Sequence, residues 1–338
     1  MTFKLGTFSI AGCLPFPGLV VGERVLSLRS VAEYLALSRR QFIEYDSIRS
    51  LLANWEHEWP LLNEVAEALN NGRAPELADR SASVESLIVH APLPEPRHVY
   101  CSGANYKKHV VQLIMAGAAD ETGGMTEEER RQFAERKMDE RARNGTPFFF
   151  IKALSAVTGP FDPIILPDDA TQPDWELELA VIMGRTARRV SRERALEYVA
   201  GYTIANDITR RERVNRRPGD SREMGMDWVA AKCAPTFLPL GPYLVPAAFV
   251  SDPQSLRITL KLNGDVMQDE STSDMIFGVA RLIENLSTIV ELQPGDVICT
   301  GSPAGNGAHY RRFLKAADVV EGSISGLGNQ INVCRDES

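Results

Sequence analysis

Three acidic residues are the strongest candidates for chemistry in this sequence. Glu176 and Glu178 are two residues apart in the segment 174–182, whose composition predicts a β-strand. Side chains two residues apart leave the same face of a strand, so both carboxylates should point the same way. The segment 201–207 also predicts a strand, and it ends at a third acid, Asp207.

These three carboxylates predict a site for a hard divalent cation. Carboxylates that lie side by side repel one another, and burying them without a partner costs free energy. A cation between them removes that cost, and oxygen ligands without Cys or His favour Mg²⁺ or Mn²⁺ over Zn²⁺. A Glu-x-Glu pair in a strand is also what an ordinary solvated strand face contains, so the pair alone does not decide.

Four stretches, taken in order, resemble the fumarylacetoacetate hydrolase family. They are Gly-Ala-Asn-Tyr-Lys-Lys-His at 103–109, Glu-Leu-Glu-Leu-Ala-Val at 176–181, Gly-Tyr-Thr-Ile-Ala-Asn-Asp at 201–207 and Pro-Gly-Asp-Val-Ile-Cys-Thr-Gly-Ser-Pro-Ala-Gly at 294–305. Four such motifs in this order are specific for the family but not for a substrate. The resemblance implies the family's β-roll, usually as a homodimer, with Glu176, Glu178 and Asp207 as the metal ligands.

The resemblance also implies that His109 is the catalytic base, a role that suits an imidazole because it titrates near neutral pH. Shorter relatives carry a glutamate three residues after this histidine, whereas this chain has Gln112. A glutamine can orient an imidazole but cannot stabilise its cation. Either a glutamate of the following segment, such as Glu121 or Glu128, supplies the charge, or the step that activates water is weakened.

Further polar residues match family positions that contact the substrate. Arg211 follows Asp207 by four residues and would face the substrate carboxylate, although Arg210 is an adjacent competitor. Lys232 would bind that carboxylate or polarise the oxo group, and so belongs to both the catalytic and the substrate-binding sets. Thr300, in a glycine-flanked loop, would offer its hydroxyl. The remaining matches are Tyr106 and Gln112, expected at the substrate, and Lys152, for which no role follows.

The implied function is a divalent-metal-dependent hydrolase that cleaves a C–C bond in an acylpyruvate-like 2,4-dioxo acid, as in the degradation of aromatic compounds. Water activated by His109 would attack the distal carbonyl group, and the pyruvate half would leave. Two alternatives stay open. The same site could decarboxylate or isomerise a 2-oxo acid, which Gln112 favours, or the chain could be a catalytically silent homologue that binds metal and ligand.

The composition is that of an ordinary globular protein. The chain has 338 residues, enough for two domains, with 44% apolar and 24% charged residues. A formal charge of −8 argues against a nucleic-acid-binding surface, and the resemblance implies a small-molecule 2-oxo acid as the partner. Five scattered cysteines predict free thiols in a reducing cytoplasm, and the lack of a long apolar run predicts no membrane span.

The predicted organisation is a small N-terminal α/β domain followed by a catalytic domain. A proline-rich linker at 91–96 places the boundary between 1–95 and 96–338. Strands outnumber helices without a β-α-β rhythm, so the predicted class is α+β with a mixed, mostly antiparallel core. A capping box at Thr126 and Glu129 predicts a helix in an insertion at about 116–147. That helix is either a lid over the site or a solvated helix on a long connection.

Several boundaries follow from local signals. The helical pattern across 51–69 should break at Pro60, and Ser191 should cap a helix over 192–200. Ser273 should cap a helix whose apolar face begins at Met275. Asn263-Gly264 predicts a hairpin between 256–262 and 266–268.

Overall fold

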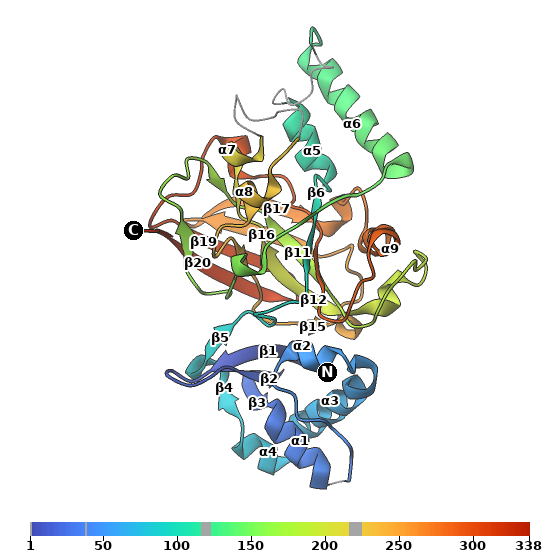
Figure 1. The fold of residues 1–338 in the computed structure, drawn as a ribbon, viewed down its shortest axis with the longest axis vertical. Helices are drawn as coiled ribbons and strands as arrows, with labels where there is room; N and C mark the ends of the chain where they lie inside the picture. The colour runs from blue at the N-terminus through green and yellow to red at the C-terminus, as the bar shows by residue number, and fades with distance from the viewer. Residues whose placement is uncertain (1, 38, 116–122, 216–224) are drawn as a thin grey trace.

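The computed structural model describes residues 2–37, 39–115, 123–215 and 225–338. The N-terminal part is a five-stranded sheet with helices on it, drawn in blue in Figure 1. Its strands are β1 Lys4–Ser9, β2 Phe16–Val21, β3 Arg24–Ser27, β4 Ala82–Ser83 and β5 Ile88–His90. Its helices are α1 Leu28–Leu37, α2 Ile48–Leu52, α3 Trp55–Asn70 and α4 Pro75–Asp79. The sheet order is β4-β3-β2-β1-β5.

The expected helix break at Pro60 was wrong. Helix α3 continues through Pro60, and the chain breaks instead at Ala53 and Asn54, between α2 and α3. Pro60 is the sixth residue of α3, so its missing N–H removes only one hydrogen bond, the one to the Glu56 carbonyl. The burial of an apolar face that includes Leu61, Leu62 and Val65 outweighs that loss.

The larger part of the chain contains two main sheets and confirms the α+β class. One sheet has the order β15-β12-β11-β18-β6-β7 and the other β17-β16-β19-β20-β9. The strands of the first are β6 Val99–Gly103, β7 Phe148–Ile151, β11 Leu177–Met183, β12 Val199–Asn206, β15 Val245–Pro246 and β18 Val297–Cys299. Those of the second are β9 Ile164–Leu166, β16 Arg257–Leu262, β17 Asp265–Ser271, β19 Val319–Ile324 and β20 Gly328–Asp336.

Strand pairing is mostly antiparallel, as predicted. The parallel pairs among the described residues are β18 with β6, β20 with β9, and β14 Leu238–Pro239 with β8 Val157–Thr158. A further antiparallel pair joins β10 Pro173–Asp174 to β13 Thr209–Arg210. The hairpin at Asn263-Gly264 joins β16 to β17 as expected, and both of its turn residues have positive φ.

Strand β11 lies at the centre of the first sheet. All seven of its residues are buried, and it pairs with β12 on one side and β18 on the other. Near the N-terminus, Leu5 of β1 forms a bridge with Leu244, so the two parts of the chain are in direct contact. A single hydrophobic cluster runs through both parts. The division at residue 95 stays a prediction.

Two predicted helices begin or end elsewhere. The segment 192–200 forms only a short 3₁₀ turn, Ala195–Tyr198, because Val199 already belongs to β12. After Ser273, helix α9 Val279–Ile289 begins only past Gly278. The intervening backbone N–H groups of Ile276 and Phe277 donate to the main chain and side chain of Asn105, which holds this segment extended.

The other α-helices of the described residues are α5 Lys107–Leu113, α6 Glu127–Asn144, α7 Arg211–Val214, α8 Trp228–Lys232 and α10 Gly307–Tyr310. Helices α5 and α6 lie at the end of the molecule opposite the N-terminal sheet, and α7 and α8 lie beside the main sheets (Figure 1). Helix α6 has the predicted capping box at Thr126 and Glu129. No helix of the described ranges is both long and apolar enough to cross a membrane.

Candidate active site

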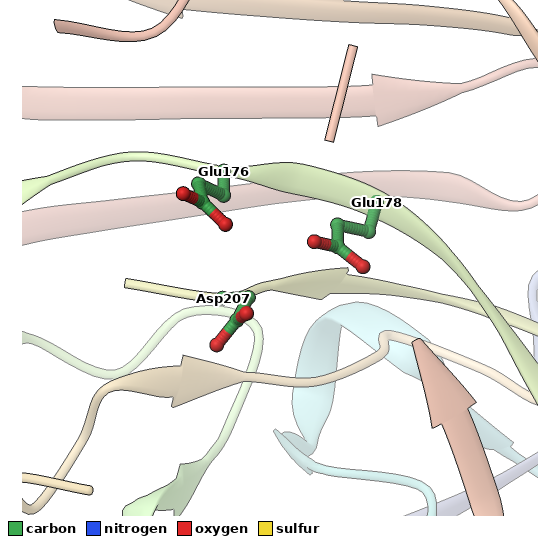
Figure 2. A group of neighbouring side chains, drawn as sticks. All are labelled: Glu176, Glu178 and Asp207. Carbon is green, nitrogen blue, oxygen red and sulfur yellow. The ribbon is translucent and has the colours of Figure 1, made fainter. Parts of the chain in front are cut away.

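The three predicted metal ligands converge at the start of β11 and the end of β12. Glu176 directly precedes β11, Glu178 is its second residue, and Asp207 directly follows β12. The antiparallel register pairs Leu177 with Asn206, which brings Asp207 beside the two glutamates. Each residue offers an oxygen within 4.8 Å of the others, and all three are buried (Figure 2). Figure 2 shows Glu176 and Glu178 extending from one strand toward the side on which Asp207 lies.

This donor set fits a hard divalent cation. Burial raises the pKa of Glu178 well above its ordinary value, and the negative charges of Asp207 and Glu176 raise it further. One Glu178 oxygen accepts a hydrogen bond from the Gly301 N–H at 2.7 Å. A bound divalent ion would remove the repulsion among these carboxylates, and carboxylate oxygens are the ligands that Mg²⁺ and Mn²⁺ prefer.

Two buried lysines hold Asp207. Lys152 Nζ lies 2.5 Å from Oδ1, and Lys232 Nζ lies 2.6 Å from Oδ2. Lys232 also contacts Glu176 Oε2 at 2.7 Å. The sequence assigned no role to Lys152, which is 1% exposed. The signal was present, because a lysine placed inside an apolar stretch must find an acid when it is buried.

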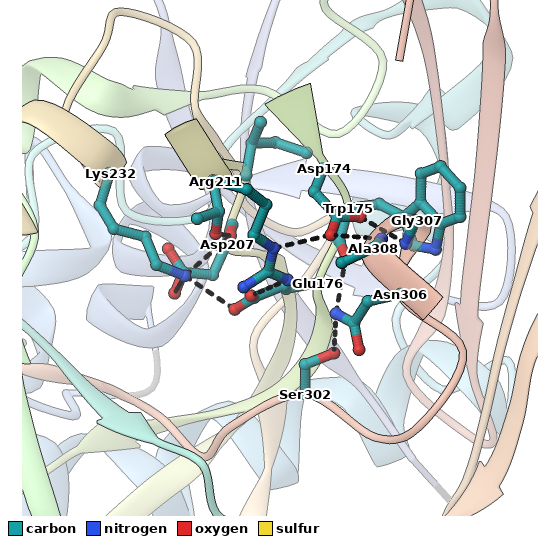
Figure 3. Close-up of polar contacts among 12 residues, drawn as sticks. Asp174, Trp175, Glu176, Asp207, Arg211, Lys232, Ser302, Asn306, Gly307 and Ala308 are labelled. Carbon is teal, nitrogen blue, oxygen red and sulfur yellow. Dashed lines mark hydrogen bonds and ion pairs between the residues drawn. The ribbon is translucent and has the colours of Figure 1, made fainter. Parts of the chain in front are cut away.

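Arg211 lines the cavity, and its guanidinium group is also held between two carboxylates. Its Nε donates to Asp174 Oδ2 at 2.7 Å, and its Nη2 lies 2.5 Å from Glu176 Oε1 (Figure 3). Although burial opposes ionisation, Lys232 and Arg211 hold the pKa of Glu176 at about 2. Arg211 therefore fixes the orientation of the Glu176 carboxylate.

Asp174, which the sequence did not single out, connects Arg211 to the start of α10. Its carboxylate is completely buried and accepts from the Gly307 and Ala308 N–H groups at 2.6 and 3.0 Å. Burial raises its pKa, while Arg211 opposes that shift. The described cluster thus has four acids, Asp174, Glu176, Glu178 and Asp207, against three cations, Lys152, Arg211 and Lys232.

His109 lies on α5 and is 8% exposed. Burial and the positive charges of Arg211 and Lys232 lower its pKa to about 4, so the imidazole is neutral at pH 7. Among the described residues no carboxylate is hydrogen-bonded to it. Gln112, one turn later, accepts from the Gly305 N–H at 3.3 Å.

Neither glutamate suggested as a substitute for the missing carboxylate lies in the described part of the site. Glu128 is exposed at the start of α6, where its side chain accepts from Gln132 at 2.8 Å. Glu121 lies outside the described residues. Helix α6 packs Ala134 and Met138 against Val110 of α5, and none of its residues lines the cavity beside His109.

Two other predicted residues take part in the frame of the site. The Thr300 hydroxyl donates to the Leu179 carbonyl at 2.9 Å and is completely buried. It thereby holds the 300–305 loop against β11, where Gly301 has φ +95° and a Cβ would approach Asn105 at 2.8 Å. Tyr106 is also completely buried, at the N-cap of α5. Contact of Thr300 or Tyr106 with a substrate stays a prediction.

A cavity of about 550 Å³ opens above the acids. Five of the predicted residues line it: His109, Glu176, Asp207, Arg211 and Lys232. Gln112, Thr300, Tyr106 and Glu178 are not among its described lining residues. The other side of the cavity is apolar and was not predicted. It is formed by Leu113, Phe148, Phe150, Val214, Met226 and Trp228.

The sequence matches a known protein family. Residues 98–335 match the family model of the fumarylacetoacetate (FAA) hydrolase C-terminal domain. The chain belongs to this family. The resemblance seen in the four motifs is therefore confirmed, and the matched residues include every member of the acid cluster.

Relatives within the family differ in the reaction they are named for. The chain is 44% identical over 187 residues to the 2,4-didehydro-3-deoxy-L-rhamnonate hydrolase of Sphingomonas sp. (strain SKA58), a match that covers 54% of this chain and 63% of that protein. It is 34% identical to the mitochondrial oxaloacetate tautomerase fahd2 of Xenopus laevis, over 73% of this chain and 68% of that one.

A solved structure shows the same fold with a metal bound. The crystal structure of maleylpyruvate hydrolase from Sphingobium sp. SYK-6 in complex with manganese (II) ion and pyruvate matches 99% of this chain and 100% of its own, with 25% identity and a TM-score of 0.69. The family thus includes hydrolases and tautomerases, and the relatives compared above are named as enzymes.

Proposed function

We propose that this chain is a divalent-metal-dependent hydrolase that cleaves a C–C bond in an acylpyruvate-like 2,4-dioxo acid. The observation that carries the proposal is the convergence of Glu176, Glu178 and Asp207 beside a cavity that is lined by Glu176, Asp207 and a neutral, buried His109. Glu176, Glu178 and Asp207 would hold Mg²⁺ or Mn²⁺. When bound, that ion would act as a Lewis acid toward the oxo and carboxylate oxygens of the substrate.

His109 would supply the base. Because its pKa is lowered to about 4, the imidazole is uncharged at neutral pH, and its unprotonated ring nitrogen can accept a proton from water. The hydroxide equivalent adds to the distal carbonyl carbon, the bond to the neighbouring carbon breaks, and its electron pair stays with the pyruvate half. The proton held by His109 then passes to that half, which gives a carboxylic acid and pyruvate.

Lys232 and Arg211 would bind the carboxylate group of the substrate. Both lie at the cavity and carry positive charge next to Glu176. A substrate carboxylate arriving there would meet donors that the protein already holds in place, so little side-chain entropy remains to be lost. A homodimer in the cytoplasm, working in the catabolism of aromatic compounds, is part of the same proposal.

A second candidate reaction uses the same residues without water. Gln112 follows His109 where a carboxylate would be needed to stabilise an imidazolium, and it contacts the Gly305 N–H instead. This observation favours proton transfer within a 2-oxo acid, that is, tautomerisation or decarboxylation. The oxaloacetate tautomerase among the relatives is consistent with it.

The two reactions differ in their products. We expect the purified protein with Mg²⁺ to convert acylpyruvates to pyruvate and the corresponding acid, and to lose this activity in EDTA. Release of CO₂ from oxaloacetate, or its enol–keto conversion without C–C cleavage of any acylpyruvate, would select the second candidate. Activity that persists unchanged in EDTA would contradict both.

A further inference from the structure

The cavity has two chemically different sides. One side is a charged floor that consists of Glu176, Asp207, Arg211 and Lys232. The other side is an apolar wall, formed by Leu113, Phe148, Phe150, Val214, Met226 and Trp228. Lys232 connects them, because its Nζ lies 5.3 Å from the centre of the Phe150 ring. A ligand with its carboxylate at the floor therefore reaches the wall within a few bonds.

The wall is an aromatic surface. The Phe150 and Trp228 rings are stacked with centroids 4.7 Å apart and an interplanar angle of 11°, and Phe148 packs on Trp228 at 5.6 Å. Phe148 and Met226 are 43% and 54% exposed, although both are large and apolar. A planar apolar group lying against this wall would remove that surface from water, which favours binding.

The charge of the whole cluster of acids and cations at the floor matches a single carboxylate. A bound divalent ion would favour ionisation of all four acids, and together with the three cations it would then leave one positive charge. One substrate carboxylate neutralises it. A second carboxylate at the far end would lie against the apolar side chains of the wall, a placement that its desolvation opposes.

A hydroxyl group stands at the base of the wall. Ser102 is 3% exposed, lines the cavity, and its Oγ has no hydrogen-bond partner among the described residues. The next residue, Gly103, is covered by the Phe148 ring, so Ser102 is adjacent to the aromatic surface. A buried hydroxyl without a partner costs free energy that a ligand oxygen would recover.

We propose that the substrate is a monocarboxylic 2,4-dioxo acid with a planar, apolar group at its far end, and that Ser102 donates a hydrogen bond to its 4-oxo group. The proposal rests on the proposed function, because it places the 2-oxo acid end at the floor. An aryl-substituted 2,4-dioxobutanoate has this chemistry. Dicarboxylic and polyhydroxylated 2-oxo acids do not.

The test compares ligands that differ only at the far end. Calorimetry on the Mg²⁺-loaded protein would measure binding of 2-oxobutanoate, of 2-oxo-4-phenylbutanoate and of 2-oxoglutarate, in which a carboxylate replaces the phenyl ring. None has a 4-oxo group to be cleaved. We expect the phenyl compound to bind at least about 10-fold more tightly than 2-oxoglutarate. Equal binding, or tighter binding of 2-oxoglutarate, would overturn the proposal.

Variants locate the contact. Trp228→Ala should weaken binding of the phenyl compound about 10-fold and leave 2-oxobutanoate unchanged, whereas Trp228→Phe should keep most of the affinity. Val229→Ala is the matched control, because Val229 is on the same helix, is 70% exposed and does not line the cavity. An equal effect of Trp228→Ala on both ligands would contradict a contact specific to the far end.

Ser102→Ala tests the hydroxyl. It should lower kcat/KM for 4-phenyl-2,4-dioxobutanoate about 10-fold while leaving the affinity for 2-oxo-4-phenylbutanoate unchanged. If Ser102→Ala also weakens binding of 2-oxo-4-phenylbutanoate, which has no 4-oxo group, the role of Ser102 is structural and the proposed hydrogen bond is wrong. Tight binding of the phenyl compound without any C–C cleavage of its 4-oxo counterpart would defeat the proposed function but leave the preference standing.

Discussion

Lys232 Nζ lies 2.6 Å from Asp207 Oδ2, so one of the metal-site carboxylates is bound to a buried cation before any metal arrives. Lys152 holds the other oxygen of Asp207. Asp207 should therefore contribute to the fold as well as to metal binding, because its carboxylate compensates the charges of two buried lysines.

Replacing Asp207 with Ala should destabilise the metal-free protein by about 3–5 kcal/mol, since Lys152 would keep only the Ile208 carbonyl as a partner. Urea unfolding in EDTA measures this. Asp169→Ala is the control: Asp169 is an exposed acid paired with Arg210, and its removal should cost less than about 1 kcal/mol. Equal stability of Asp207→Ala and the parent would contradict the structural role of the lysine pairs.

The pH dependence of stability should reveal His109. Its pKa is about 4 when folded and about 6.5 when unfolded, so the unfolded chain binds more protons between these values. The contribution is fully present above pH 6.5 and is lost as the pH falls toward 4, by up to roughly 3 kcal/mol. Unfolding of the metal-free parent and of His109→Gln across this range should show a flatter profile for the variant. Parallel profiles would mean that His109 is not buried as a neutral imidazole.

The Gln112→Glu substitution tests whether the side chain at position 112 affects the pKa of His109. A carboxylate at this position should raise the pKa of His109 and move the acid limb of the kcat/KM profile to higher pH. If the new charge reaches the imidazolium, turnover of an acylpyruvate should also increase. Gln112→Ala, which removes the contact with Gly305 without adding charge, is the control. An unchanged profile in Gln112→Glu would show that residue 112 does not act on His109.

The described part of the insertion supports α5 rather than covering the cavity. Ala134 and Met138 of α6 pack against Val110 and Ile114, and Arg141 donates to the Ala104 carbonyl at 2.8 Å. Met138→Ala should therefore cost about 2–4 kcal/mol in stability and lower kcat through the α5 helix that bears His109. Glu135→Ala, at an exposed position of the same helix outside that apolar cluster, serves as the comparison. A loss of activity in Met138→Ala without a loss of stability would instead favour a lid.

The sequence was sufficient where local rules decide the structure. The period of two along a strand places Glu176 and Glu178 together, and the hairpin at Asn263-Gly264 and the capping box at Thr126 depend only on neighbouring residues. Local sequence patterns did not predict that α3 continues through Pro60 or that the segment before α9 is extended. Tertiary contacts outweigh local propensity at both places.

Long-range contacts account for the parts of the site that the sequence missed. Lys152 and Asp207 are 55 residues apart, and Asp174 meets Gly307 across 133 residues. Phe150 and Trp228 stack although they lie far apart in the chain and belong to different elements. Such pairs have no period or spacing in the sequence, so only the assembled sheets show that the cations balance the acids and that the cavity has an aromatic wall.

The most direct test of the account follows the products of an acylpyruvate by proton NMR, with Mg²⁺, with EDTA, and with a Glu178→Gln variant in Mg²⁺. Glu178 suits this test because its carboxylate accepts a hydrogen bond from the backbone N–H of Gly301, so the substitution should leave the fold intact. We expect stoichiometric pyruvate and acid from the parent with Mg²⁺, and a decrease of at least about 100-fold in EDTA and in the variant. Pyruvate formation by Glu178→Gln at the parent's rate would contradict this expectation.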